Sequence, residues 1–359
     1  MAKRLWVVLW VALVPKLLEG VTVGELRNST GGDSFRCLLV FGDSSVDPGN
    51  NNNLKTSVKS NYPPYGKDFI HGRPTGRFSD GRLATDFIVE ALGHRKGVLP
   101  AFLDPTLRQE DLPYGVSFAS AGSGYDDLTA DLAGVLRVSR QLEYLKHYKI
   151  HLRKVVGDYD RAEEVISKGV FVISLGSNDL LQNYFVEPIR PKQFTLQGYT
   201  HYLVSRMLRY LQEMQRQGAR RVIVVGVPPL GCMPIVRTLE GNGSQRCVES
   251  INGAAFSLNS KIQREIRAAN ALLNMKIVYA DIYSPIKRVV DNPRKYGFRE
   301  TCKGCCGSGT YEYGDTCRGL STCADPTEYV FWDAIHPTQR MYKVLADHIL
   351  DSVTRDFFL

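Results

Sequence analysis

The sequence predicts an α/β fold in which a mainly parallel sheet carries helices on both faces. Short apolar, β-branched runs alternate with longer amphipathic stretches along the 359 residues, and most of the short runs end at a polar, glycine-containing motif. Alternation of this kind joins parallel strands through helical crossovers. The chain shows no linker-like change of composition and no internal repeat. We therefore expect one large domain, spanning residues 25–359.

Five short runs are expected to form the strands of the sheet, and a sixth precedes the last polar loop. The five runs cover residues 37–41, 115–119, 169–175, 221–226 and 276–280, and the sixth covers 329–332. Amphipathic stretches predict helices over residues 83–92, 138–168, 196–216 and 250–273, and a final helix that ends near residue 353. Asp80 is the expected N-cap of the first helix, and Gly93 ends it.

The segment between residues 45 and 80 is rich in glycine, proline and asparagine and contains Tyr62, Tyr65 and Phe69. A segment of this length without regular structure is usually functional or disordered, and its aromatic residues favour order. These aromatic side chains either line a binding site or pack against the domain, and the packing interpretation is at least as well supported.

The N-terminus has the pattern of a signal peptide. Lys3 and Arg4 precede an apolar run at residues 5–14 that is too short to span a bilayer. We expect a leader over residues 1–24, with cleavage near its end, and a secreted product without an integral membrane span. Asn28 and Asn242 begin acceptor sequons that this route would expose to glycosylation.

The eight cysteines support the same compartment, because an even number behind a leader favours disulfides. Cys232 and Cys247 bracket a short hydrophilic loop and are the expected pair. Five others lie within residues 302–323, where the pairing stays open. A zinc site built from Cys302, Cys305, Cys317 and Cys323 is the rival interpretation; an oxidising compartment and the irregular spacing disfavour it.

The formal net charge is +8, and about +6 without the leader. The basic residues are scattered among acidic and apolar ones, which is typical of a solvated surface. We therefore expect no nucleic-acid partner.

Polar residues follow several of the predicted strands, where open α/β sheets bind their ligands. Ser44 follows the first strand and is a candidate nucleophile. His336 is the candidate base, and Asp333, three residues earlier, is close enough to orient the imidazole. The Ser44 amide, an amide near Gly122 and the side chain of Asn178 are candidate oxyanion donors.

Each of these residues also has a purely structural explanation. Ser44 is an ordinary loop residue in that interpretation, Asn178 a helix cap, and Gly122 a turn glycine. The other six histidines lie in loops or helices without such an acidic companion. The catalytic hypothesis depends on the motifs occurring together and in order. The G-x-S-x-G elbow of α/β-hydrolases is absent from the sequence.

Six motifs then identify a resemblance: FGDSSVDPGNNN, PTGRFSDGR, FASAGSG, SLGSND, VPPLGCMP and FWDAIHPT. From about residue 36 to 353 the chain resembles the plant GDSL esterase/lipase group of the SGNH hydrolase superfamily. The resemblance implies a flavodoxin-like, three-layer α/β/α fold with a five-stranded sheet. It also implies hydrolysis of carboxylic esters through an acyl-enzyme, without metal or cofactor.

The resemblance assigns Ser44 as nucleophile, His336 as base with Asp333 as its partner, and Gly122 and Asn178 as oxyanion donors. Two positions depart from the family pattern. Ser45 stands where the block that names the family usually has leucine, a position without a chemical role. Ala121 stands where many members have glycine, which leaves open which amide of residues 120–124 faces the oxyanion.

Three functions are compatible with these residues. The first is a secreted esterase or lipase acting on a small-molecule or lipid ester. The second is an acyltransferase on extracellular lipid or cell-wall esters, which would be recognised by transfer to added alcohols. The third is a secreted binding protein on the same scaffold, which a serine-reactive probe would leave unlabelled. Acyl length and oligomeric state are not predicted.

Overall fold

The computed structural model describes residues 37–358 except residues 95, 188 and 243. The predicted leader and the sequon at Asn28 lie outside the described residues. The second sequon residue, Asn242, is exposed in the loop that follows α7 (Pro234–Leu239).

A five-stranded parallel sheet forms the centre of the domain, as predicted, with the strand order β2-β1-β3-β4-β5. Val40 of β1 is in register with Val172 of β3, and Val172 with Ile223 of β4. Helices cover both faces of the sheet, which explains why its strands are continuous apolar runs. The strands are β1 (Leu38–Gly42), β2 (Gly115–Ser117), β3 (Val170–Ser174), β4 (Arg221–Val225) and β5 (Lys276–Ala280).

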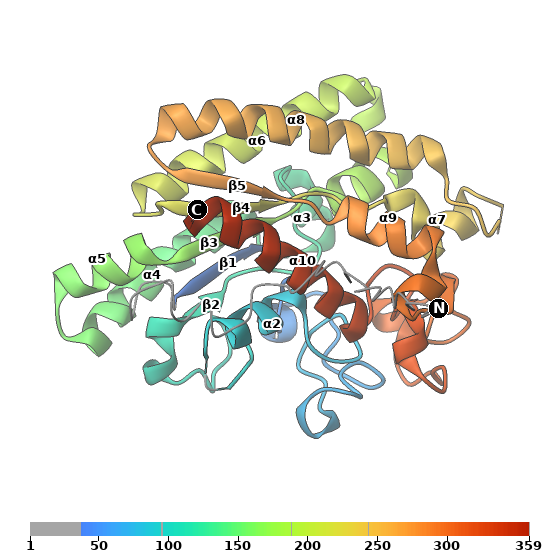
Figure 1. Cartoon of the computed structure of the whole chain (residues 1–359), viewed down its shortest axis with the longest axis horizontal. Coiled ribbons are helices and arrows are strands. Elements are labelled where there is room, and N and C mark those ends of the chain that lie inside the picture. Colours follow the sequence, from blue (N-terminus) through green and yellow to red (C-terminus); the bar gives the residue numbers. More distant parts are fainter. Residues whose placement is uncertain (1–36, 95, 188, 243, 359) are drawn as a thin grey trace, which may run out of the picture.

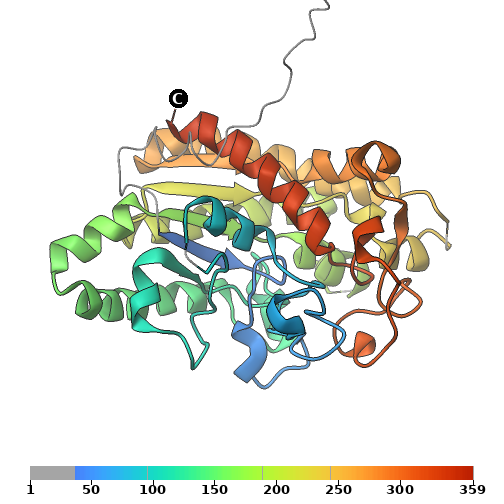
Figure 2. The ribbon, with the colours of Figure 1, turned by 60° about the horizontal axis from the view of Figure 1, so that its bottom comes forward.

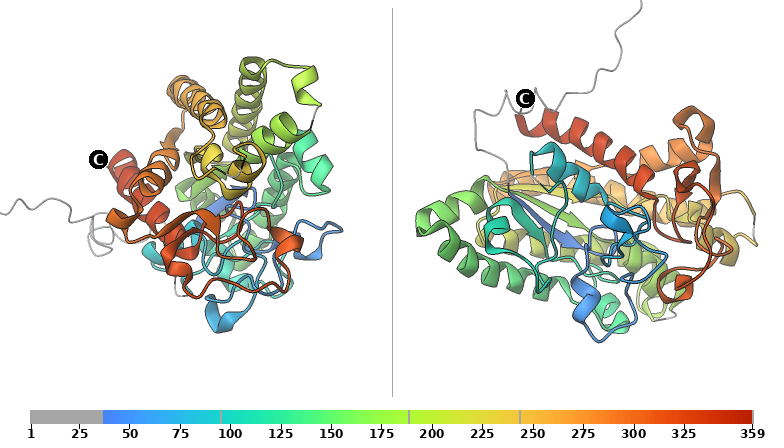
Figure 3. Two further views of the ribbon diagram at one scale, coloured as in Figure 1. Left: turned by 90° about the vertical axis from the view of Figure 1, so that its right-hand side faces the viewer. Right: turned by 90° about the horizontal axis from the view of Figure 1, so that it is seen from below.

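The sheet lies between two layers of helices, which confirms the three-layer α/β/α architecture (Figure 1). α2 (Ala84–Ala91) and α10 (Gln339–Phe358) pack against each other over one face. α4 (Val138–Val156), α6 (Leu196–Arg216) and α8 (Glu249–Leu273) cover the other face. The right-hand view of Figure 3 shows α10 and α2 on one side of the strands and α4 on the other. The remaining helices are α3 (Asp127–Ala133), α5 (Tyr159–Lys168), α7 and α9 (Tyr283–Asp291).

The single helix predicted over residues 138–168 is wrong, because two helices, α4 and α5, occupy this stretch. Gly157 ends α4 in the left-handed conformation, with φ 74°. The side chain of Asp158 then accepts a hydrogen bond from the backbone N–H of Arg161 and begins α5. A glycine C-cap followed directly by an aspartate N-cap ends one helix and begins another, even where the apolar periodicity continues across the boundary.

Asp80 does not cap α2, so that prediction is also wrong. Its carboxylate accepts a hydrogen bond, 2.7 Å long, from the backbone N–H of Gln339, the first residue of α10. The start of α2 is stabilised instead by Asp86, whose carboxylate accepts from the backbone N–H of Leu83 at 2.8 Å. Asp80 therefore links the 45–80 segment to the last helix.

The apolar run at residues 329–332 does not lie in the main sheet. Its strand, β7 (Tyr329–Phe331), pairs with β6 (Glu300–Gly304) in a separate two-stranded sheet. In Figure 2 the arrows of β1, β3 and β4 point toward the side where the loops before α10 lie. The His336 loop thus reaches the sheet edge from a second, smaller sheet.

Three disulfides are present in the described part of the chain. Cys232 pairs with Cys247, which confirms the predicted pair. The cysteine-rich segment contains the other two, Cys305–Cys323 and Cys306–Cys317. The zinc alternative is wrong, because three of its four proposed ligands are disulfide sulfurs. Within residues 37–358, as far as they are described, no helix has the length and apolarity needed to cross a bilayer.

Candidate active site

Three of the predicted residues meet at the carboxyl edge of the sheet. The Ser44 Oγ lies 2.8 Å from His336 Nε2. On the other side of the ring, His336 Nδ1 lies 2.8 Å from one carboxylate oxygen of Asp333 and 3.0 Å from the other. Asp333 is fully buried and His336 is almost so, whereas Ser44 is partly exposed. A serine hydroxyl, an imidazole and a buried carboxylate therefore form one connected chain, the arrangement that a serine nucleophile requires.

The end of β1 and the side chain of Gln141 position Ser44. A Cβ at Gly42 would lie 2.5 Å from the Ser174 carbonyl oxygen, so only glycine allows this approach of β1 to β3. The buried amide of Gln141 on α4 accepts from the Gly42 N–H and donates to the Gly42 carbonyl, both at 2.9 Å. Asp43, also buried, accepts from the amide and the hydroxyl of Ser45. Burial raises the pKa of Asp43.

Hydrogen bonds within the loop after β7 hold Asp333. One carboxylate oxygen accepts from the backbone N–H groups of Ile335 and His336, at 2.8 and 2.7 Å. The Phe78 ring packs on the imidazole with ring centroids 4.7 Å apart. The imidazole is therefore fixed by its own loop on one side and by the 45–80 segment on the other.

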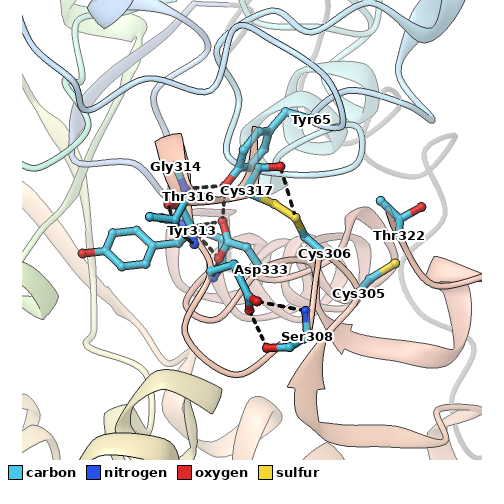
Figure 4. Close-up of a disulfide and its surroundings, with 12 residues drawn as sticks. Tyr65, Cys305, Cys306, Ser308, Tyr313, Gly314, Thr316, Cys317, Thr322 and Asp333 are labelled. Atoms are coloured by element: carbon cyan, nitrogen blue, oxygen red, sulfur yellow. Dashed lines mark hydrogen bonds and ion pairs between the residues drawn. A yellow bond between two sulfur atoms is a disulfide. The ribbon is translucent and has the colours of Figure 1, made fainter. Parts of the chain in front are cut away.

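The other Asp333 oxygen accepts a hydrogen bond, 2.6 Å long, from the Tyr65 hydroxyl. The same hydroxyl accepts from the backbone N–H of Gly314 at 2.7 Å. Gly314 lies in the segment bound by the Cys306–Cys317 disulfide, and Figure 4 shows Tyr65 beside both this segment and Asp333. Burial keeps the pKa of Tyr65 well above its usual range, so its hydroxyl remains a proton donor.

Sequence reasoning assigned no such role to Tyr65, Phe78 or Gln141. The packing interpretation of the 45–80 aromatics is nearer the observed structure, because Tyr62 and Tyr65 are buried in a cluster with Phe78 and Trp332. Phe69 lies elsewhere, on the wall of a separate hollow of about 500 Å³. The catalytic loop is thus supported by packed aromatic rings.

Three amides of the loop after β2 are occupied by hydrogen bonds within the protein. The N–H groups of Ser120 and Ser123 donate to backbone carbonyls, and that of Ala121 donates to Asp47 at 2.9 Å. Among the described residues, the amides of Gly122 and Gly124 have no hydrogen-bond acceptor. Ala121 is therefore disfavoured as an oxyanion donor, and the amides of the two glycines remain the candidates.

Asn178, after β3, lies next to this loop. Its side-chain amide donates to the Ser123 carbonyl at 2.9 Å, which leaves its second N–H for another acceptor. Asn178 also lines the cavity in front of Ser44. Ser44 and Asn178 thus line one cavity, and Asn178 also contacts the loop that contains Gly122.

The asparagine-rich stretch after Ser44 holds the Gly122 loop in place. Asn50 donates to the carbonyls of Ser117 and Ala119, and Asn51 donates to that of Ala121, at 2.8–2.9 Å. These side chains pair with backbone carbonyls at the end of the short strand β2 and in the loop that follows it. The stretch therefore supports the site without entering it.

A cavity of about 70 Å³ opens on Ser44 and His336. Apolar side chains from several elements form most of its wall. They include Leu181, Met233, Ile286, Phe331 and Leu345. Within the described residues, no group of three or more histidine, cysteine or acidic side chains is arranged to hold a metal ion.

Replacing Tyr65 with phenylalanine is expected to lower kcat about tenfold while leaving KM nearly unchanged, because a hydrogen bond to a buried carboxylate is lost. Steady-state kinetics on a soluble ester measures both constants. Tyr62→Phe is the matched control, since the Tyr62 hydroxyl donates to the Lys59 carbonyl instead. Equal effects of the two substitutions on kcat would contradict a positioning role for Tyr65.

Asp179 makes the stability of the site region dependent on pH. Burial raises its pKa to about 7, although Tyr125, Asp126 and Thr129 donate hydrogen bonds to its carboxylate. The folded protein therefore binds a proton that the unfolded chain, with a pKa near 3.9, releases. Stability from this group is present at low pH and is lost as pH rises from about 4 to 7.

Asp179→Asn should remove this dependence. The unfolding free energy of the wild type, relative to Asp179→Asn, is expected to fall by up to about 1.4 kcal/mol per pH unit between pH 4 and 7. Urea titrations of both proteins across this range measure the difference. Parallel pH profiles would show that Asp179 titrates normally.

The chain is similar to known proteins along most of its length. The family model described as GDSL-like Lipase/Acylhydrolase matches residues 38–349. GDSL esterase/lipase At5g45950 of Arabidopsis thaliana is 49% identical over 346 residues, covering 96% of this chain and 95% of that protein. GDSL esterase/lipase At5g45960, also of Arabidopsis thaliana, is 44% identical over 316 residues, covering 86% and 84%.

Among solved structures, the acetylxylan esterase Axe2 of Geobacillus stearothermophilus matches with 14% identity and a TM-score of 0.39, over 89% of this chain and 94% of that one. That likeness is too low to support an argument. The family model and the Arabidopsis relatives each cover most of the chain at substantial similarity. The chain therefore belongs to the GDSL-like lipase/acylhydrolase family, and its class of activity is that of a carboxylic ester hydrolase.

Proposed function

We propose that the protein hydrolyses acyl esters through a covalent acyl-enzyme on Ser44. The observation that carries this proposal is the 2.8 Å contact between Ser44 Oγ and His336 Nε2, continued to the buried carboxylate of Asp333. A serine hydroxyl becomes nucleophilic when a neutral imidazole accepts its proton during attack. Asp333 selects the tautomer with the proton on Nδ1 and stabilises the imidazolium that forms.

The reaction then follows from the positions of these groups. Ser44 Oγ attacks the ester carbonyl, and its proton moves to His336. The amides of Ser44 and Gly122 and the side chain of Asn178 stabilise the oxyanion; each such donor typically contributes about 10²–10³ in turnover. The carbon–oxygen bond to the alcohol breaks, and His336 protonates the departing alcohol. A water activated by His336 then releases the acid and regenerates Ser44.

A fluorophosphonate probe tests the acyl-enzyme directly. The folded protein is expected to gain one phosphonyl group, which peptide mass spectrometry should locate on Ser44. His336→Ala should react far more slowly, because the hydroxyl then lacks its base. Labelling at another residue, or equally fast labelling of His336→Ala, would refute the proposed mechanism. Analysis of products in the presence of added alcohols separates hydrolysis from acyl transfer.

We also propose that the protein is secreted. The leader pattern supports this, as do the three disulfides, which persist mainly in oxidising compartments, and the exposed sequon residue Asn242. Expression of the full chain in eukaryotic cells should place the protein in the medium, with an N-glycan that Asn242→Gln removes. Retention of an unprocessed chain inside the cells would contradict secretion.

A further inference from the structure

We propose that the acyl chain of the substrate passes Ser45 into a second cavity between the sheet and helices α2 and α10. This would make the enzyme selective for esters with a short acyl chain of a few carbons. The inference depends on the proposed function of Ser44 and concerns where the rest of the substrate lies.

The second cavity has a volume of about 40 Å³ and lies under the α2–α10 layer. Val172 and Ile223 line it from the sheet, Ile88 from α2 and Ile349 from α10. Nine of its thirteen lining residues are aliphatic; the others are Ser45, Thr85, Ser174 and Tyr342. Such a wall suits a hydrocarbon chain and provides little to bind a charged or strongly polar ligand.

The two cavities lie side by side, because five residues line both of them. They are Ser45, Ser174, Ile282, Tyr342 and Leu345. The shortest path from Ser44 to the second cavity, called the deeper cavity below, therefore runs past Ser45, the residue that follows Ser44 in the sequence.

Small side chains and an unpaired hydroxyl mark this passage. The hydroxyls of Ser45 and Ser174 lie 2.9 Å apart, and that of Ser45 also donates to Asp43. The Tyr342 side chain is 2% exposed, and its hydroxyl has no hydrogen-bond partner among the described residues.

Leucine at position 45, the usual residue of the family's name-giving block, would put a branched side chain into the passage. The serine side chain is smaller and unbranched, and its hydroxyl is held to one side by Asp43 and Ser174. Ser45 is therefore the residue that determines whether the deeper cavity is reached. Serine in place of leucine at position 45 does not take part in the chemistry, but it would affect which acyl chains the enzyme accepts.

The volumes set the expected chain length. A cavity of about 150 Å³ holds benzene, which corresponds to roughly 25 Å³ for each carbon. On this scale the deeper cavity, at about 40 Å³, holds about two carbons, and the cavity in front of Ser44, at about 70 Å³, holds about three heavy atoms. We therefore expect the best substrates to carry short acyl chains of roughly four to six carbons.

Esters of one chromogenic alcohol with acids of two to sixteen carbons test this inference on the full-length protein. For the wild type, kcat/KM should rise to a maximum near roughly four to six carbons. Ser45→Leu should lower kcat/KM for the hexanoyl ester relative to the acetyl ester about tenfold or more, because each methylene excluded from an apolar site costs roughly fourfold.

Ala84 lines the deeper cavity but not the cavity in front of Ser44. Ala84→Val therefore narrows the deeper cavity only. It should shorten the preferred chain in the same way without altering the residues beside Ser44. Ala91→Val, on the same helix but lining neither cavity, is the matched control and should leave the chain-length profile unchanged.

Two failures are distinguishable. If the acetyl ester is hydrolysed and neither Ser45→Leu nor Ala84→Val changes the chain-length profile, the acyl path is wrong and the proposed function stands. If wild-type protein hydrolyses none of the esters and its Ser44 resists the fluorophosphonate probe, the proposed function itself fails.

Discussion

Ser44→Ala is expected to lower the turnover of any ester substrate about 10⁴-fold or more, because the nucleophile of a serine triad cannot be replaced by its neighbours. The fold should be unaffected, since Ser44 is partly exposed and its amide, the proposed oxyanion donor, remains. Active-site titration and steady-state kinetics measure the loss, and thermal unfolding monitored by circular dichroism measures stability.

Ser57→Ala is a suitable control, because Ser57 is an exposed serine of the same 45–80 segment. It should retain wild-type turnover in the same preparation. If Ser44→Ala kept more than a small fraction of the activity, and no contaminating esterase were present, Ser44 would not be the nucleophile.

The largest effect on stability is expected from the buried ion pair between Arg77 and Asp86. The two side chains form a bidentate contact with both distances at 2.8 Å, and their exposed fractions are 6% and 0%. Arg77→Leu would leave a fully buried carboxylate without its cation. Breaking such a pair from one side typically costs about 3–5 kcal/mol of unfolding free energy.

Arg82→Leu provides the matched control. Arg82 lies in the same PTGRFSDGR block as Arg77, but it pairs with Glu90 at the surface. An exposed pair contributes at most about 1 kcal/mol. Equilibrium urea unfolding should therefore separate the two variants clearly. Similar midpoints for both would mean that the Arg77–Asp86 pair is dispensable. Residual activity of Arg77→Leu should fall as well, since the same block carries Phe78, which packs on His336.

Local sequence patterns were sufficient to predict the strands of the main sheet and most of the helices that pack on it. The helix predicted over residues 196–216 has these observed bounds, because an apolar stripe runs its whole length and Thr195 caps its start. The strands of the sheet are buried on both faces and were recognisable as short apolar runs. The 329–332 run looks the same in sequence, yet it pairs with β6. An apolar run does not encode which partner strand it meets.

In the site, too, contacts between residues close in sequence could be predicted, whereas contacts between distant segments could not. Asp333 and His336 are three residues apart, so their contact could be inferred from spacing, and Ser44 could be inferred from its place after a strand. Tyr65 lies 268 residues from Asp333 in sequence, and Gln141 lies 99 residues from Gly42. Contacts of this kind depend on how distant segments pack. A tyrosine in a proline-rich loop gives no sign of which carboxylate it will meet.

The Tyr65 hydroxyl, held between Gly314 and Asp333, has a consequence for how the enzyme matures. Gly314 lies between Cys306 and Cys317, so its position depends on a bond that forms only when the thiols are oxidised. A newly synthesised chain contains every residue of the triad but lacks the covalent ring that presents the Gly314 amide to Tyr65. Full activity is therefore expected to appear only after oxidative folding, so that catalytic competence is acquired together with passage through an oxidising compartment.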